Sequence, residues 1–226
     1  MDLRETPVVT IAPPGEPGAN DIEQKLKAVE TEAGKAETVA AARRTYDSAA
    51  ARRTHLERVR DALNRHVAKI NGSLKRADGE IEAALIGQYL EGGGVADIGG
   101  IVDLMLHNQA ERKAALSVIE RIVEDRLPAA LAAELQLRGD WLWVLAEELS
   151  RIAHERFEKT ADMLRGATEF ESGLCVDIRS TFSGVILARA ESLRDESRTV
   201  QANGKEIERK HRAMMSQVGP RAAIHN

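Results

Sequence analysis

The sequence has few of the features that mark secreted or membrane-spanning proteins. Its 226 residues include one cysteine, Cys175, so no disulfide framework can form within the chain and we expect a reducing compartment. No apolar uncharged run reaches about 18 residues, and the N-terminus has no basic segment followed by an apolar one. We therefore expect no transmembrane segment and no signal peptide, and a cytoplasmic location or a place within a macromolecular assembly.

Proline and aromatic residues are also scarce. Four of the six prolines lie in the first 17 residues, which leaves only Pro128 and Pro220 in the rest of the chain, and aromatic residues make up 3%. An all-β fold needs many short strands rich in branched and aromatic residues, and these are absent. The sequence predicts an all-α protein, an elongated bundle of long amphipathic helices with coiled-coil segments. The prolines and glycines of residues 1–20 predict an extended N-terminal arm.

Residues 21–90 predict a long coiled-coil helical segment. Apolar and small residues recur there every three or four positions, the spacing of a coiled-coil seam, with a local shift near residue 45. Asn71-Gly72 and Asp78-Gly79 favour a turn, but the seam keeps its phase across them, which favours one continuous helix. The second and longer part of the seam consists of Tyr46, Ala49, Arg53, Leu56, Arg60, Leu63, Val67, Ile70, Leu74, Ala77, Ile81 and Ala84.

Glycine separates this segment from a second helical region. Residues 91–100 contain five glycines, too many for a helix at about 1 kcal/mol each, and predict a Gly-rich hinge. Residues 101–218 predict a helical bundle, and residues 219–226 a C-terminal tail. Within the bundle we expect a kink or an end at Pro128, and helix boundaries at Arg138-Gly139-Asp140 and at Ser172-Gly173.

Charge is distributed unevenly although the net charge is only −4. Residues 43–76 hold ten basic residues and three acidic ones, whereas residues 78–158 hold sixteen acidic and seven basic ones. On a helical projection, five cations fall within about 40° of one line, roughly opposite the seam. This basic stripe could pair with the acidic half, remain solvated, or bind a nucleic acid or an anionic membrane. The stripe consists of Arg44, Arg58, Arg65, Lys69 and Arg76.

Two tryptophans are the other candidate partner-binding residues. Trp141 and Trp143 are two positions apart, so on a helix they point about 200° away from each other. One is expected to anchor the core while the other is exposed, as at a binding hot spot. A four-helix core that buries both is the alternative.

The sequence offers little for catalysis or metal binding. A helical di-metal site needs Glu-x-x-His on two helices, and only Glu208 to His211 matches. His154 has Glu147 and Glu158 at helical spacing, which is also typical of an ordinary charged surface. We expect no catalytic residues, no metal and no cofactor, with a helical metalloenzyme built around His154 or His211 as a distant alternative.

Together these patterns predict a non-enzymatic helical scaffold or interaction protein. We expect it to associate with itself and with other proteins, as a structural component of a larger assembly of the virion or secretion type. The main alternative is a nucleic-acid-associated helical protein that uses the basic stripe, whereas membrane contact is the weakest of the partner hypotheses.

Overall fold

The fold is all-α, as the sequence predicts. The structure, a computed structural model, describes residues 19–90, 98–164 and 169–217, and the side chains of 20–86, 99–159 and 182–216. All of the described residues except Lys35 and Ala36 are helical, and none lies in a strand. The expected arm, most of the Gly-rich hinge, the C-terminal tail and the side chain of Cys175 lie outside this description.

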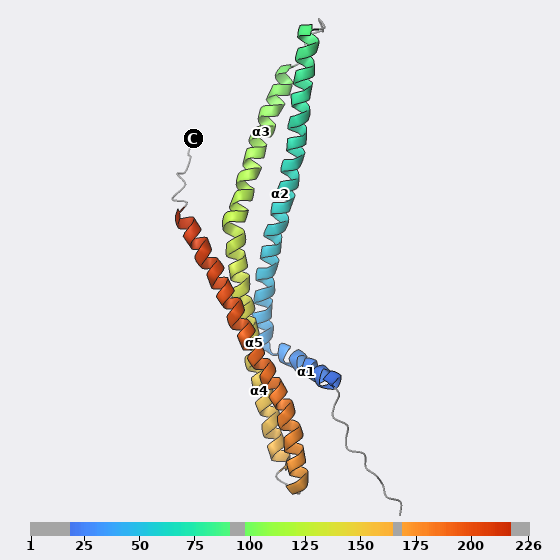
Figure 1. Ribbon diagram of the computed structural model, residues 1–226, viewed down its shortest axis with the longest axis vertical. Coiled ribbons are helices and arrows are strands. Elements are labelled where there is room, and N and C mark those ends of the chain that lie inside the picture. The colour runs from blue at the N-terminus through green and yellow to red at the C-terminus, as the bar shows by residue number, and fades with distance from the viewer. Residues whose placement is uncertain (1–18, 91–97, 165–168, 218–226) are drawn as a thin grey trace, which may run out of the picture. The chain divides into compact units, whose positions relative to one another are not determined.

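The helices follow one another with short connections (Figure 1). The described part of the chain divides into two compact units, and α4 and α5 supply residues to both. Unit 1 comprises Met1–Ala41 and Leu142–Glu196, and unit 2 comprises Ala42–Trp141 and Ser197–Asn226. The elements are α1 (Ala19–Gly34), α2 (Glu37–Leu90), α3 (Ile98–Arg121), the π-helix η1 (Ile122–Arg126), α4 (Leu127–Leu164) and α5 (Glu169–Gln217).

Unit 1 packs α1 against the second part of α4 and the first part of α5. Guanidinium groups of the later helices reach carboxylates of α1: Arg156 Nη2 lies 2.7 Å from Glu32, and Arg189 Nε lies 2.5 Å from Glu30. Beneath these pairs the apolar stripes of the helices are buried, because small and branched side chains recur at helical spacing. The core includes Val29, Ala33, Leu145, Ala146, Leu149, Ile152, Ile186, Ala190 and Leu193.

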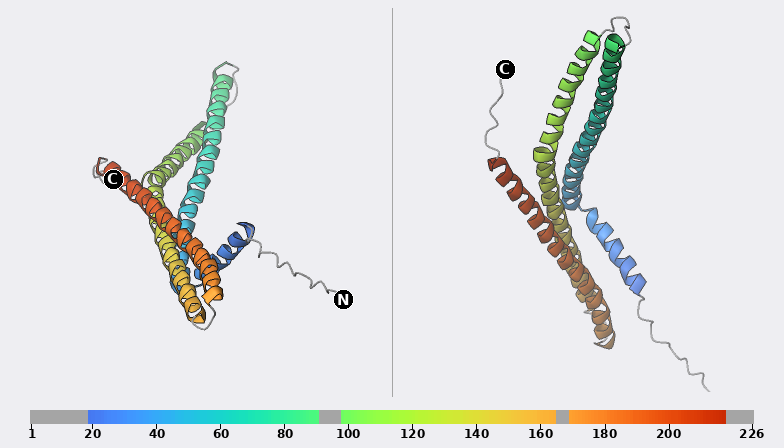
Figure 2. Two further views of the ribbon diagram at one scale, coloured as in Figure 1. Left: turned by 60° about the horizontal axis from the view of Figure 1, so that its bottom comes forward. Right: turned by 45° about the horizontal axis from the view of Figure 1, so that its top comes forward.

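Unit 2 is built around α2, which lies beside α3 in both views of Figure 2. His66 Nε2 of α2 lies 2.8 Å from Glu111 Oε1 of α3. All twelve residues of the predicted seam from Tyr46 to Ala84 are buried or half-buried. Other helices of the same chain contact this seam, since Tyr46 stacks on Trp141 and Arg53 pairs with Glu134.

The expected long helical segment of residues 21–90 is not one helix. The chain breaks at Lys35-Ala36, directly after Gly34, where the amides of both residues donate hydrogen bonds across three residues instead of four. This break falls before the local shift of the seam. The helix α2 then runs through Gly72 and Gly79, which confirms that it is continuous there.

Two other expected boundaries are wrong, and of the two outcomes expected at Pro128, a kink or an end, the end is not seen. Pro128 does not end the helix: the π-helix η1 precedes it, and the amide of Leu127 donates to the carbonyl of Ile122, five residues back. Proline has no N–H and its ring clashes with the carbonyl four residues earlier, and a wider turn accommodates both. Gly139 lies inside α4, and Ser172-Gly173 lies inside α5.

The expected hinge also needs a correction at its C-terminal end. Ile98, Gly99 and Gly100 form the first residues of α3, while residues 91–97 are outside the description. Two glycines at a helix end cost less than five within a helix, because terminal residues make fewer intrahelical hydrogen bonds.

Candidate interaction surfaces

The basic stripe lies on the exposed side of α2. Its five residues are all exposed, and none forms an ion pair with a carboxylate of the described residues. Arg65 Nε donates to the carbonyl of Asp61 at 3.3 Å, and Arg76 Nε donates to the carbonyl of Gly72 at 3.4 Å. The expected pairing of this stripe with the acidic half is therefore not seen in the part of the chain that the structure describes.

Other arginines of α2 do have carboxylate partners. Arg43 Nε lies 2.9 Å from Asp47, and Arg53 lies between Glu57 of its own helix and Glu134 of α4. Glu134 is buried, and the hydrogen bond to it raises the pKa of Arg53 above its usual range. This pair explains why an arginine occupies a position of the predicted seam.

Trp141 forms an aromatic contact within unit 2. Its ring stacks on that of Tyr46, with centroids 5.8 Å apart and an interplanar angle of 6°. The Arg43 guanidinium lies 4.5 Å from the Trp141 ring centroid and 5.2 Å from that of Tyr46, within cation–π range. Trp141 is thus half-buried in an intramolecular contact. The sequence pattern predicts that Tyr46 is a seam residue, but it does not indicate that Arg43 contacts both rings.

Trp143 has a different environment, as the helical projection predicts. It lies in unit 1 and is 39% exposed, so the alternative in which both tryptophans are buried does not hold. Its exposure is compatible with partner contact, although the side chain also has a contact within the chain.

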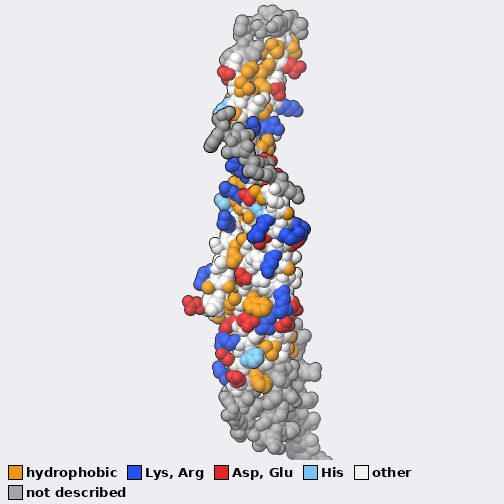
Figure 3. Space-filling model, turned by 90° about the vertical axis from the view of Figure 1, so that its left-hand side faces the viewer, with side chains coloured by type: hydrophobic (Ala, Val, Ile, Leu, Met, Phe, Trp, Pro, Cys, Tyr) orange, Lys and Arg blue, Asp and Glu red, His pale blue; other side chains and the backbone are white. Residues whose placement is uncertain are grey.

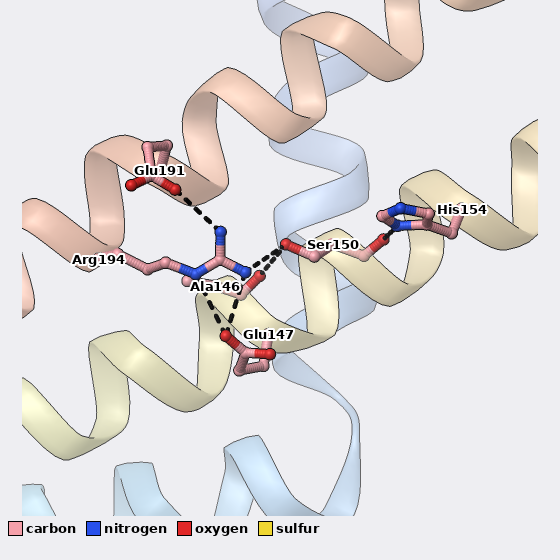
Figure 4. A network of polar contacts seen from close by, with 6 residues as sticks. All are labelled: Ala146, Glu147, Ser150, His154, Glu191 and Arg194. Carbon is pink, nitrogen blue, oxygen red and sulfur yellow. Dashed lines mark hydrogen bonds and ion pairs between the residues drawn. The ribbon is translucent and has the colours of Figure 1, made fainter.

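A polar network joins α4 and α5 inside unit 1 (Figure 4). Arg194 of α5 reaches across to α4, where its Nη2 donates to Glu147 Oε1 at 3.1 Å and to Ser150 Oγ at 2.9 Å. Glu191 holds the other end of the guanidinium at 3.0 Å, and this hydrogen bond is the main reason that the pKa of Arg194 is raised. The network joins the two helices through side-chain hydrogen bonds.

His154 and His211, the two histidines considered for metal binding, are not part of a group of metal-binding side chains among the described residues. His154 is exposed, and its Nδ1 lies 2.7 Å from the carbonyl of Ser150 on the same helix. His211 lies with its Nε2 3.2 Å from Asp125 Oδ1. Among the described residues, no group of three or more His, Cys, Asp or Glu side chains could hold a metal ion.

Exposed hydrophobic side chains are concentrated on α3 and the adjoining ends of α2 and η1. Ala115 of α3 and Ile122 of η1 are buried and Ile119 is half-buried, yet Leu104 and Leu106 are 56% and 59% exposed. Figure 3 shows hydrophobic side chains gathered near the end of the α2–α3 pair. We call this set the apolar surface; it consists of Leu85, Ile86, Val102, Leu104, Leu106, Leu116, Val118 and Val123.

Neither the hydropathy of the helices nor a comparison with other proteins indicates which kind of partner this chain binds. No helix in the described ranges is both long and apolar enough to cross a membrane. A comparison with protein-family models, curated proteins and solved structures finds no match to this chain. The functional argument therefore rests on the surfaces described above.

Proposed function

We propose that this chain is a non-enzymatic helical interaction protein that associates with copies of itself, as a structural component of a larger assembly. The exposed apolar surface on α3 is the observation that carries the proposal. A helix with one apolar stripe needs one neighbour, whereas a helix that is apolar on several sides is typical of burial on several sides. Exposed apolar patches are typical of protein interaction sites.

The pattern within α3 favours a protein partner. Val102, Leu106 and Leu116 fall within about 80° on one flank of the helix at 100° per residue. Asp103 is the sole charged residue between Ile98 and Ala110, so few charges would lose their hydration on association. A second copy of α3 presents the same surface, and two such surfaces can pair about a two-fold axis.

Sedimentation velocity over a range of protein concentrations tests this proposal. We expect the wild-type chain to associate, and the double variant Val102→Glu/Leu106→Glu to sediment as a monomer with an unchanged helical circular dichroism spectrum. The matched control His107→Glu/Ala114→Glu places charge at two exposed positions of the same helix, about 120–140° away from Val102, and should still associate. A wild-type chain that remains monomeric at every concentration contradicts the proposal.

The exposed stripe on α2 favours a second candidate function, sequence-independent binding of nucleic acid. Arg44 and Arg76 are 32 residues apart, which corresponds to about 48 Å along a helix. Five cations with no carboxylate partner among the described residues can contact phosphates and release counterions. Affinity for a DNA duplex should then fall steeply with salt and be lost in Arg58→Glu/Lys69→Glu.

The control for this second function is Lys205→Glu/Arg209→Glu, which makes the same charge change on α5. If this variant weakens binding as much as the stripe variant, net charge and not the stripe is responsible. Absence of wild-type binding at low salt rules out the second function.

A further inference from the structure

A groove runs between α2 and the segment formed by η1 and α4, entirely within unit 2. Its cavity volume is about 1170 Å³. Each wall spans twelve residue steps, Arg44–Leu56 on one side and Asp125–Leu137 on the other, which corresponds to about 18 Å of helix. The groove lies apart from the apolar surface, and no residue belongs to both.

The floor of the groove is made of small side chains. Ala49, Ala129, Ala130 and Ala133 line it, and Leu56 and Leu137 close its ends. Because the distance between packed helices depends on the side chains at the contact, alanines allow a third helix to approach closely. Ala129 and Ala133 are exposed, so part of this floor is in contact with solvent.

The rim of the groove is cationic. Arg44, Arg52 and Arg126 are exposed, and none of the three forms an ion pair with a described carboxylate. His55 adds an imidazole to the same lining. Asp125 is the one carboxylate of the lining, and it lies 3.2 Å from His211 Nε2. The three guanidinium groups of the rim therefore have no ion-pair partner among the described residues.

We propose that this groove binds an acidic amphipathic helix of a partner protein. Such a helix would place small apolar side chains on the alanines and carboxylates against the three arginines, and so satisfies both features of the groove. The length of the walls matches about three turns of helix, the usual scale of recognition of a helix in a groove. Arginine is well suited to this contact because its planar group binds a carboxylate through two parallel hydrogen bonds.

The groove is less suited to nucleic acid than the stripe is. None of the thirteen lining residues is Phe, Tyr or Trp, so the groove lacks the large aromatic side chains on which bases usually stack. A phosphate chain would satisfy the arginines, but it would leave the alanine floor in contact with water. The groove and the stripe share only Arg44, which allows variants that separate them.

Titration of the full-length chain with synthetic peptides, followed by fluorescence anisotropy, tests the proposal. The probe is a helical peptide of about 14 residues with an alanine and leucine stripe flanked by glutamates. One control peptide has glutamine in place of each glutamate, and a second has the same composition in scrambled order. We expect the probe to bind, and both controls to bind at least about tenfold more weakly because one loses the charge and the other the apolar face.

Two protein variants locate the binding site. Arg52→Glu/Arg126→Glu reverses the rim, and Ala129→Leu/Ala133→Leu fills the floor at exposed positions without changing charge. Each should weaken probe binding at least about tenfold, a loss of about 1.4 kcal/mol. Arg58→Glu/Arg65→Glu makes the same charge change as the rim variant on the stripe and should leave binding within about twofold.

Several outcomes would overturn the proposal. If the glutamine peptide binds as tightly as the probe, charge complementarity is not the basis of recognition. If filling the floor has no effect, the peptide binds outside the groove. If a DNA duplex displaces the probe from the wild-type chain but does not bind the rim variant, the groove is a nucleic-acid-binding site and not a site for an acidic helix.

Discussion

At the residue scale, Gly139 shows why a local sequence signal for a helix end predicted a boundary that the structure does not have. Gly139 followed by Asp140 is a common end of one helix and start of the next, and the sequence predicts a break there. In the structure the glycine lies inside α4 because α5 crosses over it. A Cβ at this position would lie 2.3 Å from Gln201 Cγ, and Ser197 Oγ donates to the carbonyl of Gly139 at 2.8 Å. The constraint comes from residues about 60 positions away, which local sequence cannot reveal.

This close approach predicts that Gly139→Ala destabilises the fold by about 1–3 kcal/mol, despite the better helix propensity of alanine. In a Gln201→Ala background the obstacle is gone, and the same substitution should stabilise by about 0.5–1 kcal/mol. Gly72→Ala, with nothing near the new methyl group, should stabilise in both backgrounds. Urea unfolding measures all four differences. An equal gain from Gly139→Ala and Gly72→Ala in the wild-type background would disprove the close approach.

The Arg53–Glu134 pair leads to a second residue-scale prediction. Arg53→Met leaves the buried Glu134 carboxylate without its cation and should reduce the free energy of unfolding by about 3 kcal/mol. Arg53→Met/Glu134→Leu removes both charges and should recover most of that loss. Asp47→Asn removes the charge of an exposed pair on the same helix while leaving the Arg43 guanidinium in place, and should cost less than about 1 kcal/mol. An Arg53→Met variant as stable as wild type would contradict this account.

At the scale of elements, the periodic pattern was a better guide than the breaking residues. The twelve seam positions of α2 are all at least half-buried, because burying an apolar stripe determines which side of a helix faces its neighbours. Glycine and proline mark only local preferences of the backbone. At Pro128 the wider turn of η1 accommodates the missing N–H of proline. At Gly72 and Gly79 the helix α2 continues in spite of the low helix propensity of glycine. At Gly34, in contrast, the helix α1 does end at a glycine.

The end of α5 carries an ion-pair cluster that predicts a pH dependence. Hydrogen bonds from Arg209 and then Lys210 lower the pKa of Glu206 from 4.5 to about 2. Since the folded pKa is depressed, the support this group gives to α5 is present above pH 4.5 and is lost as the pH falls toward 2. The side chains are exposed, so salt should weaken the effect.

An NMR titration of the Glu206 carboxyl carbon at low ionic strength measures this shift directly. We expect a midpoint of about 2 in wild type and a midpoint closer to 4.5 in Arg209→Ala. Arg212→Ala, which removes the neighbouring pair with Glu208, should leave the Glu206 midpoint unchanged. A wild-type midpoint near 4.5 would show that Arg209 does not hold this carboxylate in solution.

At the scale of the whole molecule, the all-α class follows from composition, because scarce proline and aromatics leave few alternatives to long helices. The exposure of the basic stripe could also be predicted, since it needs only helical geometry and the position of the seam. The groove could not. Its alanines and arginines come from segments about 80 residues apart, and nothing in either segment indicates that their small side chains face each other. Recognising such a site requires the pairing of helices, which is a long-range property of the chain.

If α3 is an interface between copies, stability must depend on concentration. Association that occurs only between folded chains stabilises the fold by mass action, whereas a folded monomer has a concentration-independent midpoint. For a dimer each tenfold increase in protein adds about 1.4 kcal/mol, which corresponds to a rise in Tm of roughly 2–6 °C for a chain of this size. Scanning calorimetry should show this rise in wild type and in His107→Glu/Ala114→Glu, and no rise in Val102→Glu/Leu106→Glu. A constant wild-type Tm would mean that α3 keeps its apolar residues in contact with water, and self-association would no longer explain them.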